Sequence, residues 1–258
     1  FLLSLEIPLP SLDEQTAIVA QIEKQKAIID GADLVLKNWR VDDYINLSCK
    51  EEAFSNIAVV DGQIVKDEKL RACFDKFYVG GENIESGTGR LSNLKTVEEA
   101  GIVGPSYIFK SGQIVYSKVR PNLQKCFFAS FEGLCSSDIY PLTVFNQNVV
   151  PEYFAKILQS KYFASKTQVF QDRAGMPKVN RDQLATINMA IPKKAEQLEI
   201  VVTINSQMQI LEGLRTMKIE AEKKINKILA DVWGVEYEET VKMEVEDEQE
   251  NMPQLNSK

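Results

Sequence analysis

The sequence predicts an α+β protein in which a β-rich domain is flanked by two long helices. Three observations carry this prediction. An apolar stripe at helical spacing occurs near each end of the chain, and the middle consists of short β-branched and aromatic runs separated by turn residues. The 258 residues are 44% hydrophobic and 26% charged, which is typical of a globular protein.

The two predicted helices are copies of one another. IPLPSLDEQTAIVAQIEKQ at residues 7–25 matches IPKKAEQLEIVVTINSQ at residues 191–207, with a two-residue length difference in the turn. Beyond that turn, Glu14 and Gln15 align with Glu196 and Gln197, an offset of 182 that continues along both segments. We therefore expect one helix within residues 1–41 and a second within residues 190–235.

Both helices follow the alternating four-and-three spacing of a coiled-coil seam. The seam positions are Ile18, Ile22, Gln25, Ile29, Ala32, Leu36 and Trp39 in the first copy, and Ile200, Ile204, Gln207, Leu211, Leu214, Lys218, Ala221, Ile225, Ile228 and Val232 in the second. The stripes can pair within the chain, as a helical hairpin, or between two chains. Gln25 and Gln207 share one seam position, where a polar residue either penalises slipped registers or is a tolerated, partly exposed side chain.

Local signals mark the ends of these helices. Ser11 and Asp13 are placed to cap the first helix, each helix follows a proline, and Gly234 marks the end of the second. At about 1.5 Å per residue, the helices span on the order of 40 and 60 Å.

The β-rich domain is expected at residues 42–189. Its strand candidates are Asn56–Val60, Gln63–Lys66, Lys76–Val79, Tyr107–Phe109, Ile114–Lys118, Cys126–Ala129 and Ile139–Phe145. One helix is expected at Val150–Thr167, and residues 236–258 are acidic enough to predict a mobile tail.

Composition narrows the classes of function. The chain has no histidine, so the usual general base and the Ser-His and Cys-His nucleophile pairs are missing, and a Cys/His zinc site is hard to assemble. The four cysteines form no C-x-x-C pair, and we expect reduced, core-packed thiols. No membrane span or signal peptide is recognisable, which favours a cytoplasmic protein. Carboxylates and lysines could still perform chemistry, so an enzyme is disfavoured rather than excluded.

The charge is unevenly distributed. The formal net charge is −7, yet Lys110–Arg181 holds 10 basic and 4 acidic side chains, a local net charge of +6. This excess suits a polyanionic partner, although ordinary solvated surfaces also carry such windows.

Several phrases resemble one family. YVGGENIESGTGRL at residues 78–91, the segment from Gly112 to Leu142 and PEYFAKILQSKYF at residues 151–163 resemble target-recognition domains of type I restriction-modification specificity subunits. IPLPSLDEQTAIVAQIE resembles the start of that family's helical spacer. The resemblance implies a single DNA-recognition domain flanked by two antiparallel coiled-coil spacer helices.

This sequence departs from the family's pattern in its number of domains. A complete subunit of that family has two recognition domains and two spacers, whereas this sequence has one domain, and Phe1–Glu6 resemble the end of a preceding one. The chain is therefore expected to be either a natural half-length subunit or the second half of a longer protein. In the first case two copies would pair through their helices.

Partners and cofactors follow from the resemblance. It implies binding to double-stranded DNA and to methyltransferase subunits, and through these to restriction subunits, with no membrane partner. It implies no catalysis by this chain, because S-adenosylmethionine, ATP and Mg²⁺ belong to the partner subunits. The sequence agrees in that it has neither a phosphate-binding loop motif nor an Asp/Asn-Pro-Pro-Tyr segment. The alternative is a non-catalytic protein-interaction scaffold built on the long helical hairpin.

If DNA binds, lysine and arginine should meet phosphates, and arginine, asparagine and glutamine can read bases. The loop between two predicted strands concentrates these types, and further candidates lie in loops near Gly or Pro. The candidate DNA-binding residues are Lys118, Arg120, Asn122, Gln124 and Lys125, followed by Arg90, Arg173, Lys178 and Arg181. Arg120 and Asn122 belong to the family phrase itself, which indicates that they hold the loop or touch the DNA backbone.

Overall fold

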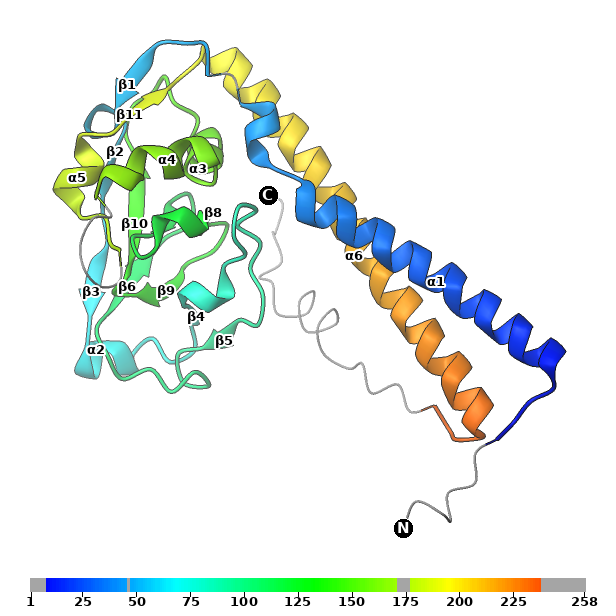
Figure 1. Cartoon of the computed structure of the whole chain (residues 1–258). Coiled ribbons are helices and arrows are strands. Elements are labelled where there is room, and N and C mark those ends of the chain that lie inside the picture. The colour runs from blue at the N-terminus through cyan, green and yellow to red at the C-terminus, as the bar shows by residue number, and fades with distance from the viewer. Residues whose placement is uncertain (1–7, 46, 171–176, 238–258) are drawn as a thin grey trace, which may run out of the picture. The chain divides into compact units, whose positions relative to one another are not determined.

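The computed structural model describes residues 8–45, 47–170 and 177–237 (Figure 1). The described chain forms two compact units, one within residues 8–39 and 207–237 and the other within residues 40–206. The expectations for Phe1–Glu6, for Arg173 and for the acidic tail beyond residue 237 lie outside the described residues.

The helical unit contains α1 (Leu12–Asn38) and most of α6 (Lys194–Trp233), which are 27 and 40 residues long. Ser11, rather than Asp13, is the N-cap of α1. Its hydroxyl accepts the Glu14 N–H at 3.4 Å, and the Glu14 carboxylate accepts the Ser11 N–H at 2.8 Å, which completes a capping box. Gly234 adopts φ +62° after α6, and the Val235 N–H donates to the Ala230 carbonyl at 3.1 Å, so the expected glycine stop is confirmed.

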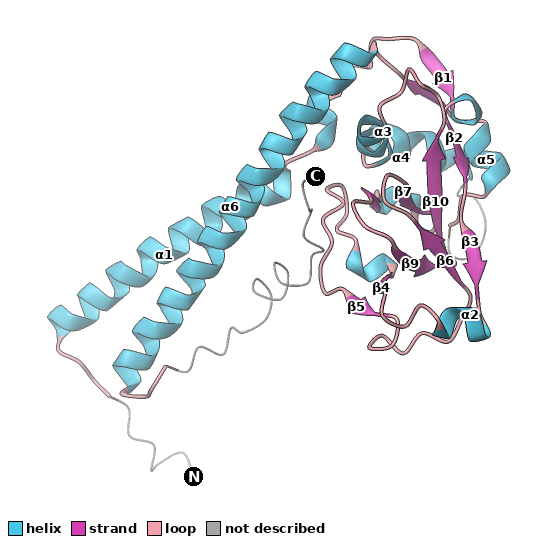
Figure 2. Ribbon diagram, turned by 180° about the vertical axis from the view of Figure 1, so that it is seen from behind, coloured by secondary structure: helices cyan, strands magenta, loops and turns pink. Residues whose placement is uncertain are grey.

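The expected seam is the least exposed stripe of both helices. In α1 the seam residues from Ile18 to Leu36 are buried or half-buried between exposed neighbours, and Leu211 and Ala221 of α6 are buried. Figures 1 and 2 show α1 and the second part of α6 side by side and antiparallel. The Lys218 ammonium lies 2.8 Å from the Asp33 carboxylate and joins the two helices. Pairing within one chain is thus present. Gln25 Oε1 is buried and has no hydrogen-bond partner among the described residues.

The second unit contains three small sheets (Figure 2). The first pairs β1 (Glu51–Ala53) with β11 (Asn188–Ala190). The second has the order β2 (Ala58–Val60), β10 (Ile139–Val144), β7 (Ile114–Ser117), β8 (Cys126–Phe128), and the third β3 (Gln63–Val65), β6 (Ser106–Phe109), β9 (Gly133–Ser136), β4 (Phe77–Val79), β5 (Lys95–Thr96). All neighbours are antiparallel except β4 and β9.

Each of the seven expected strand runs overlaps an observed strand; six observed strands are one or two residues shorter than expected, and β6 is one residue longer because it begins at Ser106. The strands β1, β5, β9 and β11 were not expected. Gly133–Ser136 lacks the alternating apolar pattern of a strand, yet Leu134 and Cys135 are fully buried at the centre of the five-stranded sheet. Its position between β6 and β4 makes this segment a strand, because both of its edges pair.

The helix expected at Val150–Thr167 is two helices, α3 (Pro151–Leu158) and α4 (Lys161–Thr167). Ser160 starts the second, because its hydroxyl accepts the Phe163 N–H at 3.0 Å as an N-cap. The remaining short helices are α2 (Asp67–Arg71), α5 (Arg181–Ala185), η2 (Val41–Tyr44), η3 (Phe54–Asn56), η4 (Gly81–Asn83), η5 (Pro121–Leu123) and η6 (Gln168–Phe170).

Aromatic rings fill much of the core. Phe109 packs edge-on against Phe127 and Phe131, with ring centroids 5.8 and 5.4 Å apart. Cys73, Cys126 and Cys135 are buried, as expected, whereas Cys49 is half-exposed, and all four cysteines are free thiols.

Two glutamines at the helix starts make the same hydrogen bond. Gln15 Nε2 donates to the Pro10 carbonyl at 2.8 Å, and Gln197 Nε2 donates to the Pro192 carbonyl at 2.8 Å. The structure therefore aligns Pro10 with Pro192, at the offset of 182 that holds further along. The two-residue length difference expected in the turn, which aligned Pro8 with Pro192, is wrong.

Candidate nucleic-acid interface

The loop between β7 and β8 is the centre of the candidate interface. Arg120 and Gln124 flank η5, and both adopt left-handed backbone conformations, with φ of +47° and +55°. Non-glycine residues rarely adopt this region, and such residues gather at functional sites. Pro121 is buried at the start of η5, while Arg120 and Asn122 are exposed. The tight turn thus presents these two side chains to solvent.

Neighbouring segments hold this loop in place. The Arg120 N–H donates to the Pro177 carbonyl at 2.8 Å, and the Ser117 N–H donates to the Lys125 carbonyl at 2.9 Å. Behind the loop, α4 packs against η5. The strained conformation is therefore supported from several sides.

The segment from Gly80 to Leu91 packs against the same loop. The Lys125 ammonium donates to the Gly81 carbonyl, and the Gly87 N–H donates to the Gln124 carbonyl at 3.3 Å. The ammonium of Lys125 is thus engaged within the protein. Asn83 closes its own segment by accepting the Gly80 N–H at 2.8 Å and donating to the carbonyls of Ser92 and Asn93.

Asp138 gathers two of the candidate cations. The Lys178 ammonium lies 2.9 Å from its carboxylate, and the Lys118 ammonium lies 3.6 Å away. Lys118 also donates to the Ser137 carbonyl at 2.8 Å. Because these groups are partly exposed, the ion pairs contribute little stability and can exchange partners with a ligand.

Two tyrosines, Tyr107 and Tyr140, contact the side chain of Arg181. The Arg181 guanidinium donates to the Tyr107 hydroxyl at 3.2 Å and lies 5.6 Å from the Tyr140 ring centroid, while the Lys118 ammonium lies 4.8 Å from the same centroid. Burial raises the pKa of the Tyr140 hydroxyl, and the Arg181 charge opposes part of this rise. The phenol therefore remains protonated at neutral pH.

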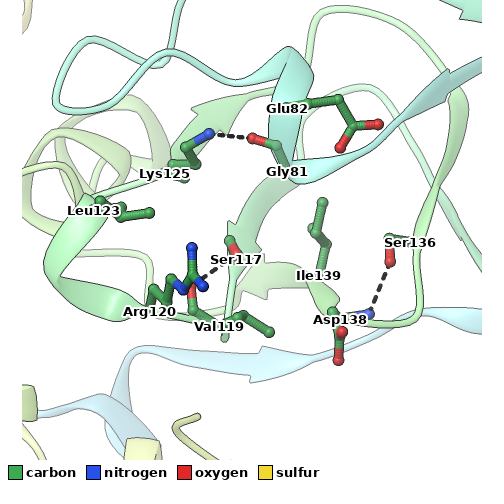
Figure 3. A pocket seen from close by; sticks show the side chains of 10 residues that line it. All are labelled: Gly81, Glu82, Ser117, Val119, Arg120, Leu123, Lys125, Ser136, Asp138 and Ile139. Carbon is green, nitrogen blue, oxygen red and sulfur yellow. Dashed lines mark hydrogen bonds between the residues drawn. The ribbon is translucent and has the colours of Figure 1, made fainter. Parts of the chain in front are cut away.

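Residues of the β7–β8 loop, of the Gly81–Glu82 segment and of Ser136–Ile139 line a pocket of about 360 Å³ (Figure 3). Glu82 and Lys125 line one side of it, and Arg120 and Asp138 lie toward the opposite side. Both signs of charge are present. Such a lining offers acceptors for amino groups of bases as well as donors for phosphates and guanine.

The structure brings most of the candidates together. Lys118, Arg120, Lys125 and Lys178 lie around the β7–β8 loop, since Val119 and Lys178 form a β-bridge. Asn122 and Gln124 belong to the same turn. Arg90 is half-buried, and its N–H donates to the Thr88 hydroxyl at 3.2 Å.

Four neighbours were absent from the sequence-based candidates: Glu82, Asp138, Tyr107 and Tyr140. The only sequence signal for Asp138 was its position in a turn after two serines, between strands. Tyr107 and Tyr140 lie within strands and read as core residues, and only their T-shaped pairing at 6.4 Å places them beside Arg181.

Within the described residues, no three His, Cys, Asp or Glu side chains are grouped so that they could hold a metal ion. Neither the two long helices nor any shorter helix in the described part of the chain has the length and hydrophobicity of a membrane span.

Comparison with known proteins gives a consistent result. The chain is 31% identical, over 167 residues, to the specificity subunit of the type I restriction enzyme EcoDI from Escherichia coli. The alignment covers 64% of this chain and 35% of that protein, so the chain spans about a third of the relative's length. No family model matches the chain.

Two solved structures are similar to this chain. A structure described as showing complex assembly and conformational transition of the type I restriction-modification system matches with a TM-score of 0.54 at 13% identity, over 88% of this chain and 60% of that one. The HsdS subunit from Thermoanaerobacter tengcongensis matches with a TM-score of 0.47 at 14% identity, over 88% and 60% of the two chains. The helices and strands of the chain, together with the match at a TM-score of 0.54, confirm the mixed helix-and-sheet fold expected from the sequence.

Proposed function

Because this chain is homologous to a type I restriction enzyme specificity subunit, we propose that its β-rich unit recognises one half of a bipartite DNA target. The observation that carries the proposal is the β7–β8 turn, which hydrogen bonds and packing hold in place. It presents Arg120 and Asn122 to solvent beside Lys118, Lys125 and Lys178.

The charges around this turn suit DNA. The cations Lys118, Arg120, Lys125, Lys178 and Arg181 stand against the carboxylates Glu82 and Asp138, so five positive and two negative charges leave a local net of +3. The positive excess would attract phosphates, which carry most of the affinity for DNA. The overall charge of −7 then keeps non-specific attraction low outside this surface.

The contacts suggest a division of roles. Arg120 is exposed, and its side chain forms no hydrogen bond or ion pair with the described residues, which suits a phosphate contact. Asn122 and Gln124 offer the paired donor and acceptor that reads adenine, and Glu82 and Asp138 can accept from cytosine amino groups. Lys125 is occupied by the Gly81 carbonyl, so it serves to hold the loop.

The proposal includes partners but no chemistry by this chain. Methyltransferase subunits would dock on the helices and bring restriction subunits with them, and S-adenosylmethionine, ATP and Mg²⁺ would be bound by those partners. Support for docking comes from large apolar side chains on the outer faces of the helices, including Leu34 (65% exposed), Ile210 (53%) and Met217 (53%). If the chain is a natural half-length subunit, a second copy of the chain would also pair through the helices.

The proposal is tested by replacing Arg120 with Ala in the chain assembled with its methyltransferase subunit. We expect weaker DNA binding and a salt dependence, log K against log salt, whose slope falls by about one, because one phosphate contact is lost. Arg71→Ala is the matched control, since Arg71 is also an exposed arginine of the β-rich unit but lies on α2.

If the salt-dependence slopes of both variants equal that of the unchanged protein, the β7–β8 turn does not contact DNA. Light scattering of the chain alone and mixed with the methyltransferase subunit tests docking separately. A chain that takes up no methyltransferase subunit and binds no DNA would favour the rival function, a protein-interaction scaffold organised by the helices.

A further inference from the structure

Gln197 is the most completely bonded polar side chain at the start of α6. It is fully buried (0% exposed), and its Oε1 accepts the Val150 N–H at 2.7 Å. Its Nε2 donates to the Asn148 carbonyl at 2.9 Å and to the Pro192 carbonyl at 2.8 Å. One amide thus joins α6, the turn before α6 and the segment that begins α3.

The bond from Val150 satisfies the N–H of a buried residue. Val150 is the N-cap of α3, is 6% exposed and has no side-chain cap. Next to it, the Lys194 ammonium donates to the Gln147 carbonyl at 2.8 Å. A buried amide hydrogen left without an acceptor is costly, so Gln197 determines how the first turn of α6 sits on this segment.

From α3 the contacts continue to the candidate DNA-binding loop. Helix α3 packs against β7 and β8, and Gln159 at its end donates from Nε2 to the Cys126 carbonyl at 2.7 Å. Cys126 follows Lys125 directly. A continuous set of packed and hydrogen-bonded groups therefore connects Gln197 with the β7–β8 turn.

The repeated copy supplies an internal comparison. Gln15 makes the equivalent bond to Pro10 but none of the bonds that Gln197 makes to a β-rich segment, as far as the described residues go. The neighbouring valines differ in the same way, since Val19 is 52% exposed and its counterpart Val201 is 9% exposed. At the start of α6 these differences accompany the hydrogen bonds that Gln197 makes with Asn148 and Val150 of its own compact unit.

We propose that Gln197 is a positioning residue that holds the first turns of α6 against the rest of the β-rich unit, so that this part of the helix and the DNA-binding loop move as one body. The consequence for target modification rests on the proposed function. DNA held by the β7–β8 turn would be presented in a fixed direction to subunits docked on the helices, and Gln197 would affect this presentation without touching DNA.

This holding role of Gln197 is tested first on the full chain by amide hydrogen exchange. Gln197→Met keeps the length of the side chain but removes its three hydrogen bonds, and Gln15→Met is the matched control. We expect exchange of the Val150 amide and of residues 194–206 to become at least tenfold faster in Gln197→Met, with β7 and β10 unchanged. An unchanged Val150 amide, or equal acceleration throughout the sheets, overturns the holding role.

The positioning role is tested in the chain assembled with its methyltransferase subunit, on a duplex carrying the site that this complex methylates in genomic DNA. We expect Gln197→Met to keep the DNA affinity and its salt slope but to lower the rate of methylation at least tenfold, whereas Gln15→Met changes neither. A fall in affinity and slope together, or an unchanged methylation rate, overturns the role. A complex of the unchanged chain that neither binds nor methylates DNA contradicts the proposed function instead, and the exchange experiment then decides on the holding role by itself.

Discussion

At the scale of single residues, the candidate interface depends on close backbone packing that leaves no room for side chains. Gly89 has φ +72°, and a Cβ placed on it would lie 2.2 Å from both the Cys126 carbonyl oxygen and Gln159 Nε2. These are the two atoms of the hydrogen bond that ties α3 to β8. A glycine is therefore required at this position for two independent reasons, backbone conformation and space.

Gly89→Ala is expected to lower the free energy of unfolding by about 2–5 kcal/mol, the sum of left-handed backbone strain and overpacking. Gly101→Ala is the control. Gly101 has φ +60° but nothing within 4 Å of an added Cβ, so only the backbone cost of about 1–2 kcal/mol applies. Urea denaturation of both variants measures the difference. Similar losses would show that the contact with Cys126 and Gln159 relaxes without cost.

At the scale of elements, the seam of α1 and α6 lies where the sequence predicts it, and seam residues are far more buried than their neighbours on the outer faces. Leu211 is 2% exposed in the seam of α6, whereas the adjacent Ile210 is 53% exposed on its outer face. Packing of the amphipathic face, rather than helix propensity, contributes most of the stability of such a helix. Two neighbouring aliphatic residues should therefore respond very differently to truncation.

Leu211→Ala is expected to cost about 2–5 kcal/mol of stability, because it opens a cavity in the helical seam. Ile210→Ala should stay within about 0.5 kcal/mol, since its side chain is largely in water. Thermal unfolding followed by circular dichroism at the helix band compares the two. Equal effects would contradict pairing of α1 with α6 within the chain.

At the scale of the whole molecule, buried ionisable groups couple stability to pH. Burial raises the pKa values of the Cys126 and Cys135 thiols and of the Tyr116 hydroxyl. In each case the folded state holds its proton at a pH where the unfolded chain releases it. The stability contributed by these groups is therefore fully present below the unfolded pKa, about 8.5 for a thiol, and is lost as pH rises above it.

The free energy of unfolding should fall above about pH 8.5 by about 1.4 kcal/mol per pH unit for each buried thiol. Urea midpoints measured from pH 7 to pH 10 test this expectation. A double variant, Cys126→Ala with Cys135→Ala, should show a shallower decline because the thiols no longer contribute. The same decline in the double variant would assign it to other groups.

The sequence by itself determined the order of the parts and the helix surfaces. Residue spacing alone predicted the seam from Ile18 to Leu36, the Ser11 cap and the Gly234 stop, because such features depend on residues within one or two turns. The seven strand runs were predictable for the same reason, since alternation and turn residues act locally. The phrases near Tyr78, Gly112 and Pro151 led to the family resemblance that the curated relative confirms.

Tertiary structure alone decided features that depend on distant partners. Gly133–Ser136 becomes a central strand only between β6 and β4, and Asp138 joins Lys118 and Lys178 only because the bridge from Val119 to Lys178 closes. The equivalence of Pro10 and Pro192 likewise became visible through the hydrogen bonds of Gln15 and Gln197. Such contacts join residues far apart in sequence, and they contribute free energy only when the whole unit packs. Local sequence patterns therefore do not predict them.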